Sequence, residues 1–103
     1  MAQVIWTEPA LSDLDTIADY IALDKPLAAR QLVRKIFKKV DLLRRFPNLG
    51  AVVPELRNLP YRQLFISPCR LFYRLQKSKI FVVFVMRGEK HFSFDHWRWG
   101  EKN

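Results

Sequence analysis

The sequence predicts an α+β fold in which a helical hairpin packs on one face of a mostly antiparallel, four-stranded sheet. Three observations lead to this prediction. A short β-favouring segment at 3–6 comes first, two long stretches with apolar residues at helical spacing follow, and three β-favouring segments lie at 61–66, 70–76 and 79–87. The order of strand, two helices and three strands is typical of one helical layer on one sheet.

The first helix is expected over 8–23. Thr7 is a favourable N-cap residue, and Glu8 and Pro9 suit the first helical turn. The apolar stripe of this helix consists of Leu11, Leu14, Ala18 and Ile21.

The second helix is expected to begin at Pro26, because a missing N–H costs nothing at a first helical position. It should end at Phe46-Pro47, and an irregular connection with three prolines follows over 47–60. Basic residues occupy most of the surface outside its apolar stripe, which consists of Ala29, Leu32, Val33, Ile36, Phe37, Val40 and Leu43.

A tight turn at Lys77-Ser78 would set the register of the last two strands. The predicted pairs are Leu75 with Ile80, Tyr73 with Val82, Leu71 with Phe84, and Arg70 with Val85. Because side chains alternate between the faces of a sheet, this register divides the hairpin into two sets. The apolar set, assigned to the helix side, is Leu71, Tyr73, Leu75, Ile80, Val82, Phe84 and Met86.

The other face mixes guanidinium groups with aromatic and apolar surface, and places Arg70 and Arg87 close together at the open end of the hairpin. Its members are Arg70, Phe72, Arg74, Phe81, Val83, Val85 and Arg87. Three interpretations remain open: a surface covered by another part of the chain, a protein-docking surface, or a cleft for RNA.

Length and charge restrict the possible functions. With 103 residues and a net charge of +8, the chain is expected to be one domain over 1–103. All 18 Lys and Arg residues lie from Lys25 onward. Such a distribution favours nucleic acid, a nucleic-acid enzyme or an acidic protein as partner, although a solvated basic surface is the alternative.

The chain is expected to be cytoplasmic. Its only cysteine, Cys69, excludes an internal disulfide, and residues 1–6 do not resemble a signal peptide. The longest apolar run, Ile80 to Met86, is too short to span a bilayer, so no membrane partner is expected.

No pattern for a cofactor, metal or phosphate-binding loop occurs, and His91 with His96 is read as a pair of surface histidines. One chemistry fits the basic residues: attack of an RNA 2′-hydroxyl on the adjacent phosphate, without metal. The candidate catalytic residues for it are Arg70, Arg87, Lys90 and His91. Glu55 would join them only if its loop folds over the site.

Several motifs in order resemble the RelE/ParE toxin superfamily, most closely its ParE branch, from Val4 to about Lys90. They are Val4-Ile5-Trp6, Ala10-Leu11-Ser12-Asp13-Leu14, Ile17-Ala18-Asp19-Tyr20-Ile21, Phe46-Pro47 with Gly50, Val53-Pro54-Glu55-Leu56, Tyr61-Arg62-Gln63-Leu64 and Arg70-Leu71-Phe72-Tyr73-Arg74. The resemblance implies the fold predicted above and a toxin that a cognate antitoxin neutralises.

The resemblance also implies one of two targets. ParE-like toxins poison DNA gyrase, which is the favoured expectation, whereas RelE-like toxins cut mRNA on the ribosome. A member that has lost its toxicity is a third reading. Binding of antitoxin or target is expected at Arg62, Phe72, Arg74, Phe81 and Val83. The tail over 91–103 receives no assignment.

Overall fold

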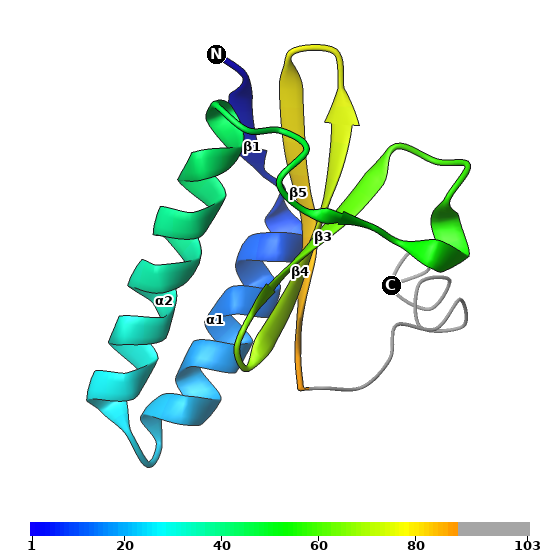
Figure 1. The fold of residues 1–103 in the computed structure, drawn as a ribbon. Helices are drawn as coiled ribbons and strands as arrows, with labels where there is room; N and C mark the ends of the chain where they lie inside the picture. Colours follow the sequence, from blue (N-terminus) through cyan, green and yellow to red (C-terminus); the bar gives the residue numbers. More distant parts are fainter. Residues whose placement is uncertain (89–103) are drawn as a thin grey trace.

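The structure, a computed structural model, describes residues 1–88 (Figure 1). Its elements in chain order are β1 (Gln3–Trp6), α1 (Glu8–Ala22), α2 (Pro26–Asp41), η1 (Leu42–Arg44), β2 (Ala51–Val52), η2 (Pro54–Leu56), β3 (Tyr61–Ile66), β4 (Cys69–Gln76) and β5 (Lys79–Arg87). The predicted α+β fold, with its helical hairpin on a mostly antiparallel sheet, is confirmed.

The sheet has the strand order β1-β5-β4-β3-β2, with β1 parallel to β5 and the other neighbours antiparallel. The prediction of four strands is therefore one short. The additional strand, β2, is only two residues long and lies inside the proline-rich connection. A pair of residues shows no alternation of apolar and polar positions, so the sequence pattern does not reveal it.

Thr7 joins β1 to α1 in the way its position predicts. Its side-chain oxygen accepts a hydrogen bond from the Ala10 N–H at 3.3 Å, which caps the helix. The same hydroxyl donates to the Val82 carbonyl at 2.7 Å, so the cap also fixes α1 to β5. The helices α1 and α2 form an antiparallel hairpin, and both cover one face of the sheet in Figure 1.

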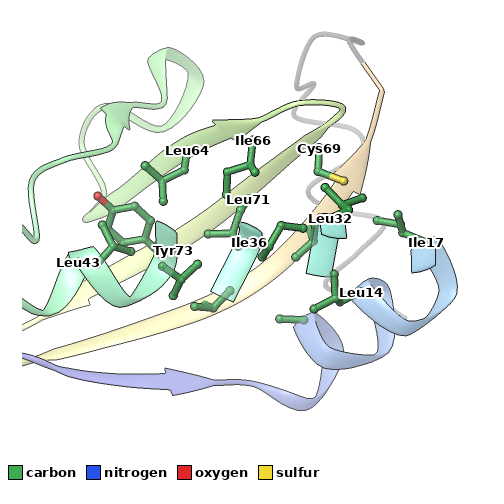
Figure 2. Packing of buried hydrophobic residues seen from close by; sticks show 14 of the residues in the cluster. Leu14, Ile17, Leu32, Ile36, Leu43, Leu64, Ile66, Cys69, Leu71 and Tyr73 are labelled. Atoms are coloured by element: carbon green, nitrogen blue, oxygen red, sulfur yellow. The ribbon is translucent and has the colours of Figure 1, made fainter. Parts of the chain in front are cut away.

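The main core lies between the two helices and this helix-covered face. Ile36, Tyr73, Ile80 and Val82 are each 0% exposed. Figure 2 shows side chains from both helices and from β3 and β4 meeting in this layer. Burial of large apolar side chains contributes about 1.5–3 kcal/mol each, so this layer supplies most of the stability of the fold.

The register of β4 and β5 changes at a β-bulge between Phe72 and Tyr73, where Val83 is the extra residue of β5. The predicted pairs Leu75–Ile80 and Tyr73–Val82 are confirmed, since they precede the bulge. Beyond it, the predictions are wrong by one residue. The observed pairs are Phe72 with Phe84, Leu71 with Val85, Arg70 with Met86, and Cys69 with Arg87.

Two contacts from α1 and its N-cap satisfy the backbone around this bulge. The Asp13 carboxylate accepts a hydrogen bond from the Val85 N–H at 3.0 Å, and Thr7 binds the Val82 carbonyl from the same side. A bulge leaves ladder groups without a partner in the sheet, so these side chains remove that cost. As a result Val85 faces the helices, whereas Phe84 and Met86 face the opposite side.

Among residues 1–88, the helices are all too short or too polar to cross a membrane.

Candidate functional site

The candidate site is the sheet face opposite the helices, hereafter the open face. Cross-strand partners share a face, so the pairings of β3, β4 and β5 define its members. They are Tyr61, Gln63, Phe65, Arg70, Phe72, Arg74, Phe81, Val83, Phe84 and Met86. Four of the residues predicted to bind antitoxin or target are among them, namely Phe72, Arg74, Phe81 and Val83.

The centre of the open face is covered by the connection between the helices and β3. Val53 and Leu56, which are 0% and 3% exposed, pack on Phe72, and the Phe84 ring lies 4.9 Å from the Phe72 ring. Phe72 is itself 0% exposed, so it supports the surface from beneath and does not offer a contact. The interpretation that another part of the chain covers this face is thus correct for its centre, and the cover is the loop.

One end of the open face carries Arg70. Its guanidinium donates a hydrogen bond to Gln63 Oε1 at 2.5 Å, and its Cζ lies 5.7 Å from the centroid of the Phe72 ring. The cross-strand neighbour of Arg70 is Phe65, which is 57% exposed. This end therefore combines an oriented cation with an accessible aromatic ring.

The other end carries Arg74, whose Cζ lies 4.9 Å from the centroid of the Phe81 ring. Within residues 1–88, its buried Nε atom has no hydrogen-bond partner. Stacking on the Phe81 ring orients the Arg74 guanidinium at this end of the face. Phe81 and Val83 beside it are partly buried.

Arg87 does not belong to this face. The bulge turns it to the helix side, where its guanidinium lies 4.6 Å from the centroid of the Tyr20 ring of α1. The prediction that Arg70 and Arg87 lie close together is therefore wrong. Arg87 also lies near Cys69, and its charge opposes the effect of burial, which raises the pKa of that thiol.

Arg62 pairs with Tyr73 and so belongs to the helix side of β3, not to the open face. Its guanidinium donates to the Gly50 carbonyl at 2.7 Å and to the Asn48 carbonyl at 3.4 Å. These contacts fix the start of the connection that covers the open face. Arg62 thus holds the connection in place within the chain, and it lies on the opposite face from the other four predicted binding residues.

Tyr73 is a supporting residue to which the sequence interpretation gave no role. Its hydroxyl donates to the Pro47 carbonyl at 2.7 Å and accepts from the Gly50 N–H at 2.9 Å. Burial raises the pKa of Tyr73, while the bond from Gly50 and the charge of Arg62 lower it. The signal was available, since a buried tyrosine hydroxyl needs a partner and the rest of its predicted face is apolar.

Gly50 allows the connection to approach this closely. A Cβ atom there would lie 2.6 Å from the Gln63 carbonyl and 2.7 Å from the Tyr73 ring. Any larger residue would push the connection away from β3 and β4. Gly50, Tyr73 and Arg62 together position the cover on the centre of the open face.

The proposed ribonuclease residues are not brought together in the part of the chain that the structure describes. Arg70 and Arg87 lie on opposite faces, while Lys90 and His91 lie outside the described residues. Glu55 lies on η2, which does fold over the open face, and its side chain is exposed. Residues 1–88 contain no group of three His, Cys, Asp or Glu residues that could hold a metal ion.

Comparisons with known proteins agree with this architecture. The family model described as the ParE toxin of the type II toxin–antitoxin system parDE matches residues 4–92. A relative called Toxin RelE2, from Caulobacter vibrioides, is 38% identical over 68 residues, which are 66% of this chain and 73% of that protein. A chain from the solved chromosomal ParDE toxin–antitoxin system of P. aeruginosa superposes with a TM-score of 0.73 at 28% identity, covering 86% of this chain and 98% of that one.

Proposed function

Because this chain belongs to the ParE toxin family of type II toxin–antitoxin systems, we propose that it inhibits DNA gyrase in the bacterial cytoplasm by binding it. The chain is a type II toxin of the ParE/RelE group, and a cognate antitoxin is its partner. In this proposal the toxin performs no chemistry of its own, and it acts through the open face.

One observation carries the choice of a binding protein over a nuclease. Cleavage of RNA by its own 2′-hydroxyl needs several charges converging on one phosphate. Arg70 and Arg87, the two predicted guanidinium groups, lie on opposite sides of the sheet, and the ring of Tyr20 holds Arg87 there. On the open face, Arg70 and Arg74 lie at opposite ends and do not converge on one point. The geometry of the described residues therefore favours recognition of a surface.

The open face has the composition of a protein interface. Arginine and aromatic residues are the side chains that most often dominate binding energy at protein interfaces. Here Arg70 with Phe65 and Arg74 with Phe81 form two such pairs at the ends of the face. The apolar cover of Val53 and Leu56 packs on Phe72, which lies between the two pairs on β4.

The alternative is a ribosome-dependent mRNA endonuclease. The similarity to a relative called Toxin RelE2 and the oriented guanidinium of Arg70 favour it. In that mechanism Arg70 would stabilise charge on the phosphate, and Lys90 or His91 would supply the proton transfers. Arg70→Ala would then reduce cleavage sharply, because an interaction made in the transition state is lost.

The experiment that separates these functions uses one preparation of the purified full-length chain in two assays. The first follows supercoiling of plasmid DNA by gyrase, and the second follows cleavage of mRNA on ribosomes. Loss of supercoiling with intact mRNA is the expected result. Cut mRNA with unaffected gyrase would replace the proposal with the endonuclease. No effect in either assay, together with harmless expression, would indicate a member that has lost its toxicity.

A further inference from the structure

The Arg70 guanidinium is held in one orientation by two contacts on the open face. It donates to Gln63 Oε1 at 2.5 Å, and its Cζ lies 5.7 Å from the centroid of the Phe72 ring. Gln63 and Phe72 are cross-strand partners, and Arg70 belongs to the next pair on the same face. The two contacts therefore draw the side chain of Arg70 along the sheet, toward the pair beside it.

Hydrogen-bond chemistry determines which end of the Gln63 amide faces the arginine. A guanidinium has five N–H donors and no acceptor, so the amide oxygen faces it and the two Nε2 donors point away. The bond to Gln63 uses one of the donors of Arg70. Both side chains are partly buried, so an anion that reaches this end of the open face meets a positive charge that water screens less than at a fully exposed site.

The strands beneath this site contain no carboxylate that would compete with a partner for the guanidinium. The sequences of β3, β4 and β5 include no Asp or Glu. Glu55 belongs to the cover, on η2, and its side chain is exposed. Beside Arg70, the ring of Phe65 is 57% exposed. This end of the open face thus suits an acidic side chain on a segment with apolar neighbours.

We infer that gyrase places a carboxylate on the Arg70 guanidinium, and that Gln63 is the positioning residue that prepares Arg70 for it. A guanidinium and a carboxylate form paired hydrogen bonds only where the planar fork faces its partner. A long arginine side chain loses rotamer entropy when it becomes fixed, and the bond to Gln63 removes part of that cost before gyrase binds. The inference rests on the proposed function, because it names the group of gyrase that the open face recognises.

A purely structural role for Gln63 is the competing explanation, since the same bond also links β3 to β4. The two roles differ in what a glutamate does at this position. Gln63→Glu retains an acceptor and holds Arg70 by a charge-assisted bond, so the link between the strands is kept. Its carboxylate also neutralises the guanidinium and repels the carboxylate of gyrase, so recognition is lost.

The test measures the concentration of the full-length toxin that half-inhibits supercoiling by gyrase, together with the melting temperature of each variant. Gln63→Glu should raise this concentration at least about tenfold, or roughly 1.4 kcal/mol, with no loss of thermal stability. Gln63→Met lacks the acceptor and leaves the charge of Arg70 in place. It should raise the concentration about threefold, because only the orientation is lost.

The matched control is Gln31→Glu, on α2. It makes the same change of residue and of charge at an exposed position on the other side of the sheet. Half-inhibition should stay within about twofold of the wild type, since a single exposed charge contributes little.

A double-mutant cycle tests whether Gln63 acts through Arg70. In a chain that carries Arg70→Gln, the further change Gln63→Met should leave half-inhibition unaltered, because no guanidinium remains to be positioned. Additive effects of the two substitutions would show an independent contribution of Gln63 and would overturn the positioning role.

Wild-type inhibition by Gln63→Glu would overturn this inference and leave the proposed function in place. A loss of inhibition by Gln63→Glu that is matched by a loss of thermal stability would assign Gln63 the structural role instead. A wild-type toxin without effect on gyrase would remove the proposed function and this inference together. Reduced mRNA cleavage by the same variants would then assign the anion to an RNA phosphate.

Discussion

The two faces of the sheet are closed to different extents. On the helix side, an apolar layer that includes Leu43 and Ile66 lies between the sheet and the two helices that cover it. On the open face, only Val53 and Leu56 provide a cover, and the ends beside Arg70 and Arg74 are left to other contacts. Under the proposed function, the sheet separates the core that stabilises the fold from the surface that binds the target. Substitutions on the helix side should change folding, and those at the ends of the open face should change function.

The largest effect is expected from Ile36→Ala, in the centre of the helix-side core. Ile36 is 0% exposed, and removal of such a side chain costs about 2–5 kcal/mol of unfolding free energy. Urea denaturation followed by circular dichroism measures it. The neighbouring exposed residue supplies the control, since Arg34→Ala should change stability by less than about 0.5 kcal/mol.

A smaller effect is expected from Leu56→Ala, which removes half of the cover on the open face. Leu56 is 3% exposed, but its cluster is small and close to solvent, so the cost should lie near the lower end of the same range, about 2 kcal/mol. The exposed neighbour provides the control as Glu55→Ala. A cost as large as that of Ile36→Ala would contradict the difference between the two faces.

Tyr73→Phe should cost about 1–3 kcal/mol, because the Gly50 N–H and the Pro47 carbonyl lose a buried partner. Tyr20→Phe is the control, since that ring is 59% exposed and keeps its contact with Arg87. An equal change in both variants would show that the hydroxyl of Tyr73 does not hold the connection.

The same hydroxyl predicts a dependence of stability on pH. The pKa of Tyr73 is raised in the folded chain above its ordinary value of about 10. The folded state therefore retains the proton to higher pH than the unfolded state. This contribution is complete below about pH 10 and is lost as pH rises toward the folded pKa. Tyr73→Phe should remove that part of the alkaline loss, and a denaturation series in alkaline buffers measures it.

Much of the fold could be predicted from the sequence, because local rules determine it. The cap at Thr7, the helix restart at Pro26 and the pairing of Leu75 with Ile80 follow from local residue types and spacing. The placement of Arg87 could not be predicted in this way. It depends on the bulge at Val83, and the run Ile80 to Met86 is apolar on both faces, so it shows no alternation that would reveal a bulge.

The contacts that accompany the bulge join residues far apart in the chain. Asp13 binds the Val85 N–H, and the two residues are 72 positions apart. The cover on the open face also joins residues that are not neighbours in the chain, since Val53 and Leu56 meet Phe72 from another element. Phe72 was predicted as a binding residue because its type and strand position place it on the open face. The structure does place it there, but the cover buries it. On β3, β4 and the part of β5 before the bulge, alternation predicts which residues lie on the open face, but which of them are accessible follows from tertiary packing.

The most direct test of the central claim compares gyrase inhibition by two double variants of equal charge loss. Arg70→Gln with Arg74→Gln alters both ends of the open face, and Arg30→Gln with Arg34→Gln alters exposed positions on α2. The concentration for half-inhibition of supercoiling should rise at least about tenfold for the first pair, which corresponds to roughly 1.4 kcal/mol, and stay near the wild-type value for the second. Both variants should remain folded, although the first pair loses the hydrogen bond of Arg70 and the ring contact of Arg74. Equal inhibition by the two variants, or a larger loss for the α2 pair, would contradict the assignment of the open face as the surface that binds gyrase.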